Sequence, residues 1–218
     1  MSHFALPLLA TLFFQAPPAQ ILSLGDSYTI GESVLEKERW PNQLRELLEL
    51  EGILCAPPEI IAKTGWTTDE LLAALQPQTE KDAYDIVTLS IGVNNQYRGR
   101  DVDSYRKELR ELIDFAIEKA SGKPDRVILL SIPDWGVTPF AKDRDRAKIA
   151  AEIDAYNRVK KEEAERAKVH FIDITDITRD IEGAKKNLLA EDGLHPSGIM
   201  YRQWAAKVLP IAQKILKK

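Results

Sequence analysis

His195 is the histidine best placed for acid–base chemistry in this sequence. Asp192 precedes it by three residues, and Gly193 between them permits a tight turn. In such a turn the carboxylate can accept the Nδ1 hydrogen of the imidazole, which leaves Nε2 free to act as a base. Pro196 follows directly, keeps His195 out of helical geometry and suits the first position of a last helix. Taken alone, the segment equally suits a surface loop with an ordinary aspartate turn.

Ser27 is the residue that such a base could activate. It lies in a Gly-Asp-Ser turn directly after the first predicted strand, where its hydroxyl would project at the edge of a sheet. The tripeptide is also ordinary turn chemistry, so it is a weak signal by itself. Thr29 stands where a G-x-S-x-G nucleophile elbow needs glycine, so the α/β-hydrolase fold is not indicated. Cys55, in an Ile-Leu-Cys-Ala run, is interpreted as a small buried hydrophobic residue.

Gly65 and Asn94 are candidates for stabilising a negatively charged oxygen. Gly65 has no Cβ, so its backbone N–H can come close to a reacting carbonyl, just before a predicted helix start. Asn94 offers a side-chain amide that does not titrate. With the backbone N–H of Ser27, these groups would form a three-donor oxyanion hole. A plain turn glycine and a loop cap explain the two residues separately just as well.

The elements that must position these residues are strands of a parallel sheet. From residue 20 onward, short apolar runs alternate with longer segments of helical period, which is typical of βα units. Five runs are expected to be strands: Ile21–Leu24, Glu59–Ala62, Asp85–Ile91, Arg126–Ile132 and Val169–Ile174. Ligands bind at the carboxyl ends of strands in open parallel sheets. The segments 25–27, 64–66 and 92–95 follow strands one to three, and 192–196 comes after the fifth.

Two segments between and after the strands have the apolar spacing of amphipathic helices. Their stripes comprise Val102, Tyr105, Leu109, Leu112, Ile113 and Ala116 in one segment, and Trp204, Val208, Ile211 and Ile215 in the other. Thr67 followed by Glu70 predicts a capping box at a helix start, and Ser33 followed by Glu36 is a second candidate.

The composition is that of an ordinary globular protein with a small-molecule partner. Thirty Lys+Arg against 34 Asp+Glu give a net charge of −4 and a pI near 5.5, so no basic field is available for nucleic acid. The charge-dense stretches Lys142–Arg146 and Lys160–Lys168 mix both signs and are interpreted as the solvated face of a long helix. A single cysteine excludes an intramolecular disulfide and a multi-cysteine zinc site.

The N-terminal residues 1–19 are a candidate signal peptide that precedes one domain over residues 20–218. Phe4–Phe14 has the length of an apolar h-region, although no Lys or Arg precedes it and Pro17 and Pro18 interrupt the cleavage positions. A removed leader would make the protein secreted or periplasmic, and an N-terminal helix packed on the domain would leave it cytoplasmic. No stretch reaches the roughly 18 apolar residues of a spanning helix, so no integral membrane segment is expected.

The four polar segments, in this order and at these strand ends, resemble the SGNH (GDSL) hydrolase family over residues 20–218. The resemblance implies an α/β, flavodoxin-like three-layer αβα sandwich with a five-stranded parallel sheet of order 2-1-3-4-5. It implies Ser27 as the nucleophile, Gly65 and Asn94 as oxyanion donors, and Asp192 with His195 as the rest of a triad.

One residue departs from the family pattern. Where the family usually has Gly-x-Asn-Asp, this chain has Asn95 in the aspartate position. The donor Asn94 is kept, so the hydrogen bonding that the aspartate normally provides is the feature placed in doubt.

The implied reaction is two-step ester hydrolysis through an acyl-enzyme, with no metal or organic cofactor. Trp66, Tyr97, Trp135 and Phe140 follow strand ends and are candidates for the wall of an acyl or aryl pocket, although core packing explains them equally well. Within the family, the sequence looks most like small lysophospholipase and arylesterase-like members. Carbohydrate acetylesterases share the same motifs and are the alternative.

Two readings without acyl chemistry remain open. A flavin-binding or receiver-like module has the same βα rhythm but needs a phosphate-cradling loop or an acidic cluster after strand one, of which residues 25–29 offer only a partial version. A non-catalytic relative could keep the fold as a carbohydrate-binding surface. The presence of every acyl-transfer role argues against both.

Overall fold

Five parallel strands form one sheet in the order β2-β1-β3-β4-β5 within the part of the chain that the structure describes. The structure is a computed structural model that describes residues 17–75, 83–180 and 187–217. The strands are β1 (Ile21–Gly25), β2 (Glu59–Ala62), β3 (Ile86–Ser90), β4 (Val127–Leu130) and β5 (His170–Ile172). The predicted strand order is confirmed. The candidate signal peptide lies almost wholly outside the described residues, so it and the localisation that depends on it stay predictions.

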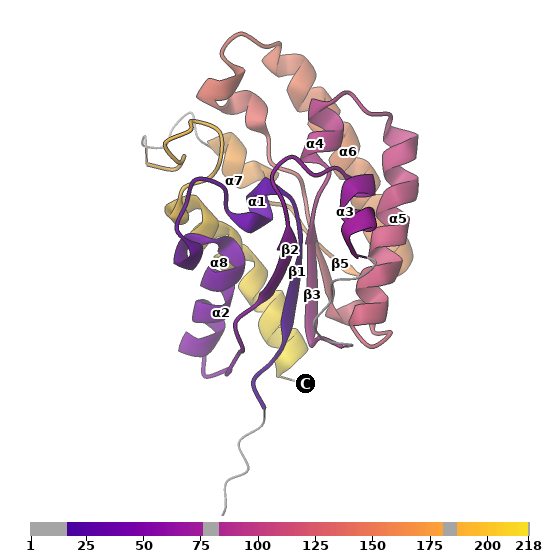
Figure 1. Cartoon of the computed structure of the whole chain (residues 1–218), viewed down its shortest axis with the longest axis vertical. Coiled ribbons are helices and arrows are strands. Elements are labelled where there is room, and N and C mark those ends of the chain that lie inside the picture. Colours follow the sequence, from indigo (N-terminus) through magenta and orange to yellow (C-terminus); the bar gives the residue numbers. More distant parts are fainter. Residues whose placement is uncertain (1–16, 76–82, 181–186, 218) are drawn as a thin grey trace, which may run out of the picture.

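Helices cover both faces of this sheet (Figure 1). The helices α2 (Trp40–Leu50) and α8 (Gly198–Leu216) lie on one face, and α3 (Thr68–Leu75), α5 (Val102–Lys119) and α6 (Arg146–Ala167) lie on the other. Short helices begin near the carboxyl ends of the strands: α1 (Ser27–Ile30), α4 (Val93–Tyr97) and α7 (Thr175–Arg179). Four 3₁₀ turns complete the described elements: η1 (Glu36–Glu38), η2 (Pro124–Arg126), η3 (Trp135–Val137) and η4 (Pro139–Ala141). The three-layer α/β architecture is therefore confirmed.

The central strands are buried on both faces because helices cover both. Every residue of β1, β3 and β4 is buried, whereas the edge strands β2 and β5 are partly exposed. In β1, Leu24 pairs with Ile61 of β2 on one side and with Leu89 of β3 on the other. The third, fourth and fifth strands are shorter than the predicted runs, because the outermost residues of those runs belong to flanking loops or, for Arg126, to η2.

The predicted amphipathic helices are present. In α5 the buried residues are Tyr105, Leu109, Leu112, Ile113 and Ala116, and in α8 Trp204, Val208 and Ile215 are buried. Within the described residues, no helix is both long enough and apolar enough to cross a membrane. Cys55 is buried as expected, and burial raises the pKa of its thiol to about 11.

Two predicted helix starts are wrong. Ser33 caps no helix; it has a left-handed backbone (φ 63°), and its hydroxyl donates to Asp192 at 2.7 Å. Pro196 lies before α8 rather than at its first position, because Ser197 is the N-cap residue. By contrast, the carboxylate of Glu70 accepts the backbone N–H of Thr67 at 2.9 Å, as a capping box requires.

The interpretation of Lys160–Lys168 as a purely solvated face is also wrong. Lys160 and Glu163 on α6 are 0% and 1% exposed. Glu163 binds the guanidinium groups of Arg106 and Arg110 on α5 and of Arg166 on its own helix, at 2.6 to 2.8 Å. Only Arg166 is a partner at helical spacing; the two guanidinium groups from α5 complete the pairing that allows a carboxylate to be buried between two helices.

Candidate active site

Ser27 lies at the carboxyl end of β1, at the first position of α1. Asp26 caps that helix, because its carboxylate accepts the N–H of Tyr28 at 3.0 Å. Gly25 allows the chain to pass close to its neighbours here: a Cβ at this position would lie 2.2 Å from Thr29 Oγ1 and 2.4 Å from the carbonyl oxygen of Ser90. The Gly-Asp-Ser turn is therefore a packed junction between strand and helix. It leaves Ser27 only 4% exposed.

His195 and Asp192 form the predicted carboxylate–imidazole pair. His195 Nδ1 lies 2.6 Å from Asp192 Oδ2. The other carboxylate oxygen accepts the backbone N–H groups of Leu194 and His195, each at 2.9 Å. With Nδ1 facing a carboxylate, Nε2 is the ring nitrogen available for proton transfer.

Asp192 is held in its charged form. Burial acts to raise the pKa of this carboxyl, but the hydrogen bonds from His195, Leu194 and Ser33 outweigh burial and lower the pKa to about 2. The contact with Ser33 spans 159 residues of chain, so no local pattern predicts it.

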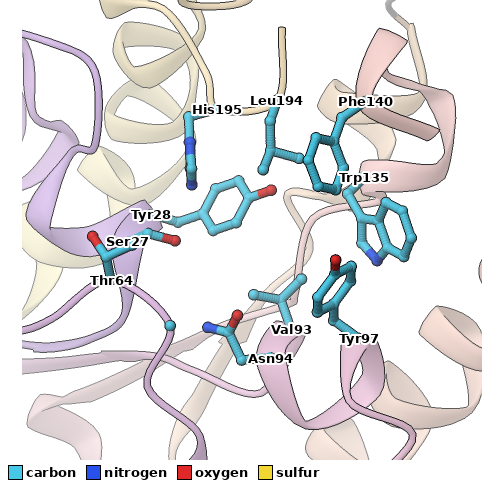
Figure 2. A pocket seen from close by; sticks show the side chains of 11 residues that line it. Ser27, Tyr28, Thr64, Val93, Asn94, Tyr97, Trp135, Phe140, Leu194 and His195 are labelled. Carbon is cyan, nitrogen blue, oxygen red and sulfur yellow. The ribbon is translucent and has the colours of Figure 1, made fainter. Parts of the chain in front are cut away.

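Ser27 and His195 line the same pocket, together with Gly65 and Asn94. Figure 2 shows a ring nitrogen of His195 facing the Ser27 side chain. Within the described residues, the Ser27 hydroxyl and the His195 imidazole form no direct hydrogen bond. Such contacts are commonly long without substrate and tighten when the substrate binds. The sequence predicts that Ser27 and His195 lie close together, and the structure brings both side chains to one pocket.

The two predicted oxyanion donors are braced by hydrogen bonds of their own. Gly65 has a φ of 86°, a conformation that favours glycine, and its carbonyl accepts a guanidinium hydrogen of Arg98 at 2.6 Å. The Asn94 amide donates to the carbonyl of Trp66 at 2.9 Å. An amide nitrogen carries two hydrogens, so Asn94 keeps one for a ligand in the pocket.

Asn95 ties the same two segments together. Its side-chain oxygen accepts the N–H of Thr68 at 3.1 Å, and its amide donates to the hydroxyl of Thr68 at 2.6 Å. That hydroxyl in turn donates to Glu108. An aspartate at position 95 would compete with Glu108 for the one hydroxyl hydrogen, so asparagine fits this environment.

The far side of the pocket is aromatic. Trp135 lies edge-on to Tyr97 and to Phe140, with ring centroids 5.2 and 6.0 Å apart, and all three line a cavity of about 160 Å³. The predicted Trp66 is not among the described residues that line this pocket; it packs against the hydrophobic core instead. The lining also includes Tyr28, Thr64, Val93 and Leu194, which sequence reasoning missed. All four are direct chain neighbours of predicted site residues, and that adjacency is the signal that could have found them.

Two buried ionisable side chains, Asp26 and Lys160, interact electrostatically near the carboxyl ends of the strands. Burial raises the pKa of Asp26 to about 7, opposed by the Tyr28 N–H and by the charge of Lys160. Burial likewise lowers the pKa of Lys160 to about 7, opposed by Asp26. The Lys160 ammonium donates to the carbonyls of Ile91 and Leu130, at 2.7 and 2.8 Å. It therefore holds the carboxyl ends of β3 and β4 together, close to α4 and its candidate oxyanion donor Asn94.

Metal ligation has no candidate among the described residues, where no group of three or more His, Cys, Asp or Glu side chains is arranged to hold an ion. The polar groups that converge on the pocket are instead a hydroxyl, an imidazole and amide donors. This set can carry out acyl transfer without a metal.

Several solved structures share this fold. TesA aligns with a TM-score of 0.70 and 21% identity over 90% of this chain and 99% of its own. The esterase EstA from Pseudoalteromonas sp. aligns at 0.67 and 20% over 92% and 100%. A variant of Axe2, an acetyl xylan esterase from Geobacillus stearothermophilus, aligns at 0.67 and 21% over 89% and 94%. No curated protein sequence matches the chain.

Family membership is decided by the sequence itself. The profile of the GDSL-like Lipase/Acylhydrolase family matches residues 23–203, which include every predicted catalytic and oxyanion residue. The chain therefore belongs to this family and is a carboxylic ester hydrolase of the SGNH type.

Proposed function

We propose that this protein is a serine esterase that hydrolyses small acyl esters through a Ser27 acyl-enzyme. The observation that carries the proposal is the convergence of Ser27, His195, Gly65 and Asn94 on one pocket, with Asp192 hydrogen-bonded to the far side of the imidazole. Nucleophile, base, orienting carboxylate and oxyanion donors are all supplied.

In the first step, His195 Nε2 takes the proton of the Ser27 hydroxyl as Oγ attacks the ester carbonyl carbon. The carbonyl oxygen becomes an oxyanion, for which the N–H groups of Ser27 and Gly65 and the free amide hydrogen of Asn94 are the donors. Asp192 keeps the imidazole in the required tautomer and stabilises its positive charge. The intermediate collapses, the bond to the alcohol breaks, and the imidazolium gives its proton to the departing oxygen.

In the second step, water replaces the alcohol. His195 takes a proton from the water as it attacks the acyl carbon, the same donors stabilise the second oxyanion, and the acid leaves as Oγ of Ser27 regains its proton. One ester and one water give one acid and one alcohol, and the enzyme is regenerated.

The pocket supports a small substrate. Its volume of about 160 Å³ lies below the range of about 300–1,000 Å³ that is typical of pockets for drug-sized ligands. Aromatic and aliphatic side chains form most of the lining opposite Ser27. The apolar lining favours the lysophospholipase or arylesterase-like assignment, whereas the small volume suits a short acyl group from either class. Carbohydrate acetylesterase activity is the second candidate, supported by the likeness to an acetyl xylan esterase.

The test is the Ser27→Ala variant with 4-nitrophenyl butyrate. We expect kcat to fall on the order of 10⁶-fold, because the nucleophile cannot be replaced by its neighbours. Ser104→Ala, on the exposed start of α5, is the matched control and should retain wild-type rates. Unchanged turnover by purified Ser27→Ala would refute the proposal.

A series of nitrophenyl esters of increasing chain length, measured beside acetylated xylan, distinguishes the two substrate classes. A higher kcat/KM on the nitrophenyl esters than on acetylated xylan supports the first candidate. Higher kcat/KM on the polysaccharide would favour the second.

A further inference from the structure

Tyr28 places a phenol hydroxyl in the pocket that the proposed mechanism does not use. The side chain is 4% exposed and packs between His195 and Trp204, with ring centroids 5.0 and 6.1 Å away. Figure 2 shows the ring extending from beside Ser27 across the pocket, with its oxygen directed away from Ser27 and toward the side that carries Leu194. Tyr28 is therefore fixed by packing and presents its polar end to the cavity.

This hydroxyl has no partner among the described protein groups. The hydroxyls of Tyr105 and Tyr201 also lack partners, but they are sealed in the core, whereas Tyr28 lines the cavity. The other polar atoms of the aromatic side are differently placed. The indole N–H of Trp135 is held by Gln96 at 2.7 Å, and Tyr97 is 45% exposed, so water keeps access to it.

A ligand in the pocket changes which groups can form a hydrogen bond with the Tyr28 hydroxyl. Solvent can satisfy the Tyr28 hydroxyl while the pocket is open, and a bound substrate displaces that solvent. A plain alkyl group would leave the hydroxyl buried and unpaired, which is unfavourable. A substrate oxygen at the same place would restore the hydrogen bond.

We infer that Tyr28 determines specificity by hydrogen-bonding an oxygen atom in the acyl or alcohol part of the ester. Preferred substrates then carry an ether, carbonyl or hydroxyl oxygen close to the ester group in place of a plain alkyl chain. The inference rests on the proposed esterase function of the same pocket and narrows its substrate class.

The phenol acts as a neutral group in this role. Burial raises the pKa of Tyr28 far above its ordinary value, and the negative charges of Asp26 and Asp192 raise it further. The hydroxyl therefore keeps its hydrogen at every pH at which an esterase is assayed, and it can donate to an ether or carbonyl oxygen throughout.

The test compares isosteric esters in wild type and Tyr28→Phe. One pair varies the acyl part, 4-nitrophenyl methoxyacetate against 4-nitrophenyl butyrate, and the other varies the alcohol part, 2-methoxyethyl acetate against butyl acetate. In each pair one oxygen replaces one methylene. The readout is the ratio of kcat/KM for the oxygen-containing ester to that for its alkyl partner, because comparing this ratio between two enzymes cancels the intrinsic reactivity of the esters.

We expect Tyr28→Phe to lower the ratio about fivefold in at least one pair. Tyr201→Phe is the matched control, since it removes an equally unpaired hydroxyl that faces the core, and it should leave both ratios unchanged. Ratios in Tyr28→Phe within twofold of wild type for both pairs would overturn the inference while leaving the esterase proposal intact. If the wild type hydrolysed none of the four esters, the esterase proposal itself would be refuted.

Discussion

Two aspartates lie near the same pocket, and their pKa values are shifted in opposite directions. Asp192 accepts hydrogen bonds from two backbone N–H groups, from Ser33 and from the imidazole of His195, and its pKa falls to about 2. Asp26 is 2% exposed and accepts the N–H of Tyr28, and burial raises its pKa to about 7. Deep burial with few donors therefore raises the pKa of Asp26, whereas Asp192 is more exposed and has enough donors to outweigh its desolvation.

Only one of the two carboxylates is suited to support a catalytic base. An imidazolium that forms during catalysis needs a neighbour that is charged at neutral pH, and Asp192 meets that condition. Asp26 instead shares a buried site with Lys160, where each group partly offsets the desolvation of the other. We therefore propose that Asp192 supports His195 in catalysis and that Asp26 has a structural role next to Ser27.

The largest expected effect separates the two carboxylates directly. Asp192→Asn should lower kcat by roughly 10⁴-fold, because an amide neither holds the required tautomer nor stabilises the imidazolium. Asp26→Asn keeps an oxygen for the Tyr28 N–H and removes a buried charge, so its effect on kcat should be far smaller. Both values come from steady-state hydrolysis of 4-nitrophenyl butyrate. A larger loss in Asp26→Asn than in Asp192→Asn would reverse the assignment.

The next effect concerns stability at the buried pair. Lys160→Met removes the donor to Ile91 and Leu130 and leaves Asp26 without its opposing charge, so the free energy of unfolding should fall by about 1–3 kcal/mol in urea titrations. Lys161→Met, on the exposed neighbouring position, is the matched control.

The double variant Asp26→Asn/Lys160→Met sharpens this test. Removing both charges leaves neither one buried alone, so the double variant should lose less stability than the two single variants added together. Strict additivity would show that the two groups do not interact.

The titration of Asp26 and Lys160 should also make the free energy of unfolding depend on pH. Asp26 has an ordinary pKa of 3.8 and a folded value of about 7, so the folded state holds the extra proton between these values and stability falls as pH rises through that window. Lys160 has an ordinary pKa of 10.5 and a folded value of about 7, so its contribution recovers as pH rises above 7. The stability of Asp26→Asn relative to wild type should therefore increase from pH 4.5 to pH 7 in urea unfolding. A constant difference would contradict the raised pKa.

The smallest effect tests how Asp192 is held. Ser33→Ala removes one of the hydrogen bonds that lower its pKa, so the pKa should rise while the carboxylate stays charged at neutral pH. We expect kcat at pH 7 to fall by only a few fold, or about 1 kcal/mol in activation free energy. A fall in kcat as large as that in Asp192→Asn would mean that Ser33 has a catalytic role independent of Asp192.

The fold and most of the pocket could be predicted because they depend on local patterns. Apolar runs mark strands that are buried on both faces, and the rule for parallel sheets places the residues after them at one edge. Ser27, Gly65 and Asn94 each follow a strand, and the three-residue spacing of Asp192 and His195 sets their contact through a tight turn. Each of these placements needs only a short stretch of sequence.

The features that were missed depend on contacts between distant segments. Lys160 belongs to a run of mixed charge, and only the packing of α6 on the sheet shows that its ammonium is buried against two strand ends. The direction of Trp66 at a tight turn, and the contact from Ser33 to Asp192, are likewise set by tertiary packing. A single sequence carries no periodicity that reports such pairs.

Labelling with a fluorophosphonate probe, mapped by mass spectrometry, tests the central claim most directly. The probe forms a stable adduct with a serine only where a base, an oxyanion site and an accessible hydroxyl act together. We expect one adduct, on Ser27, in the wild type, and its loss in His195→Ala. An unlabelled protein, or a label on a different residue, would contradict it.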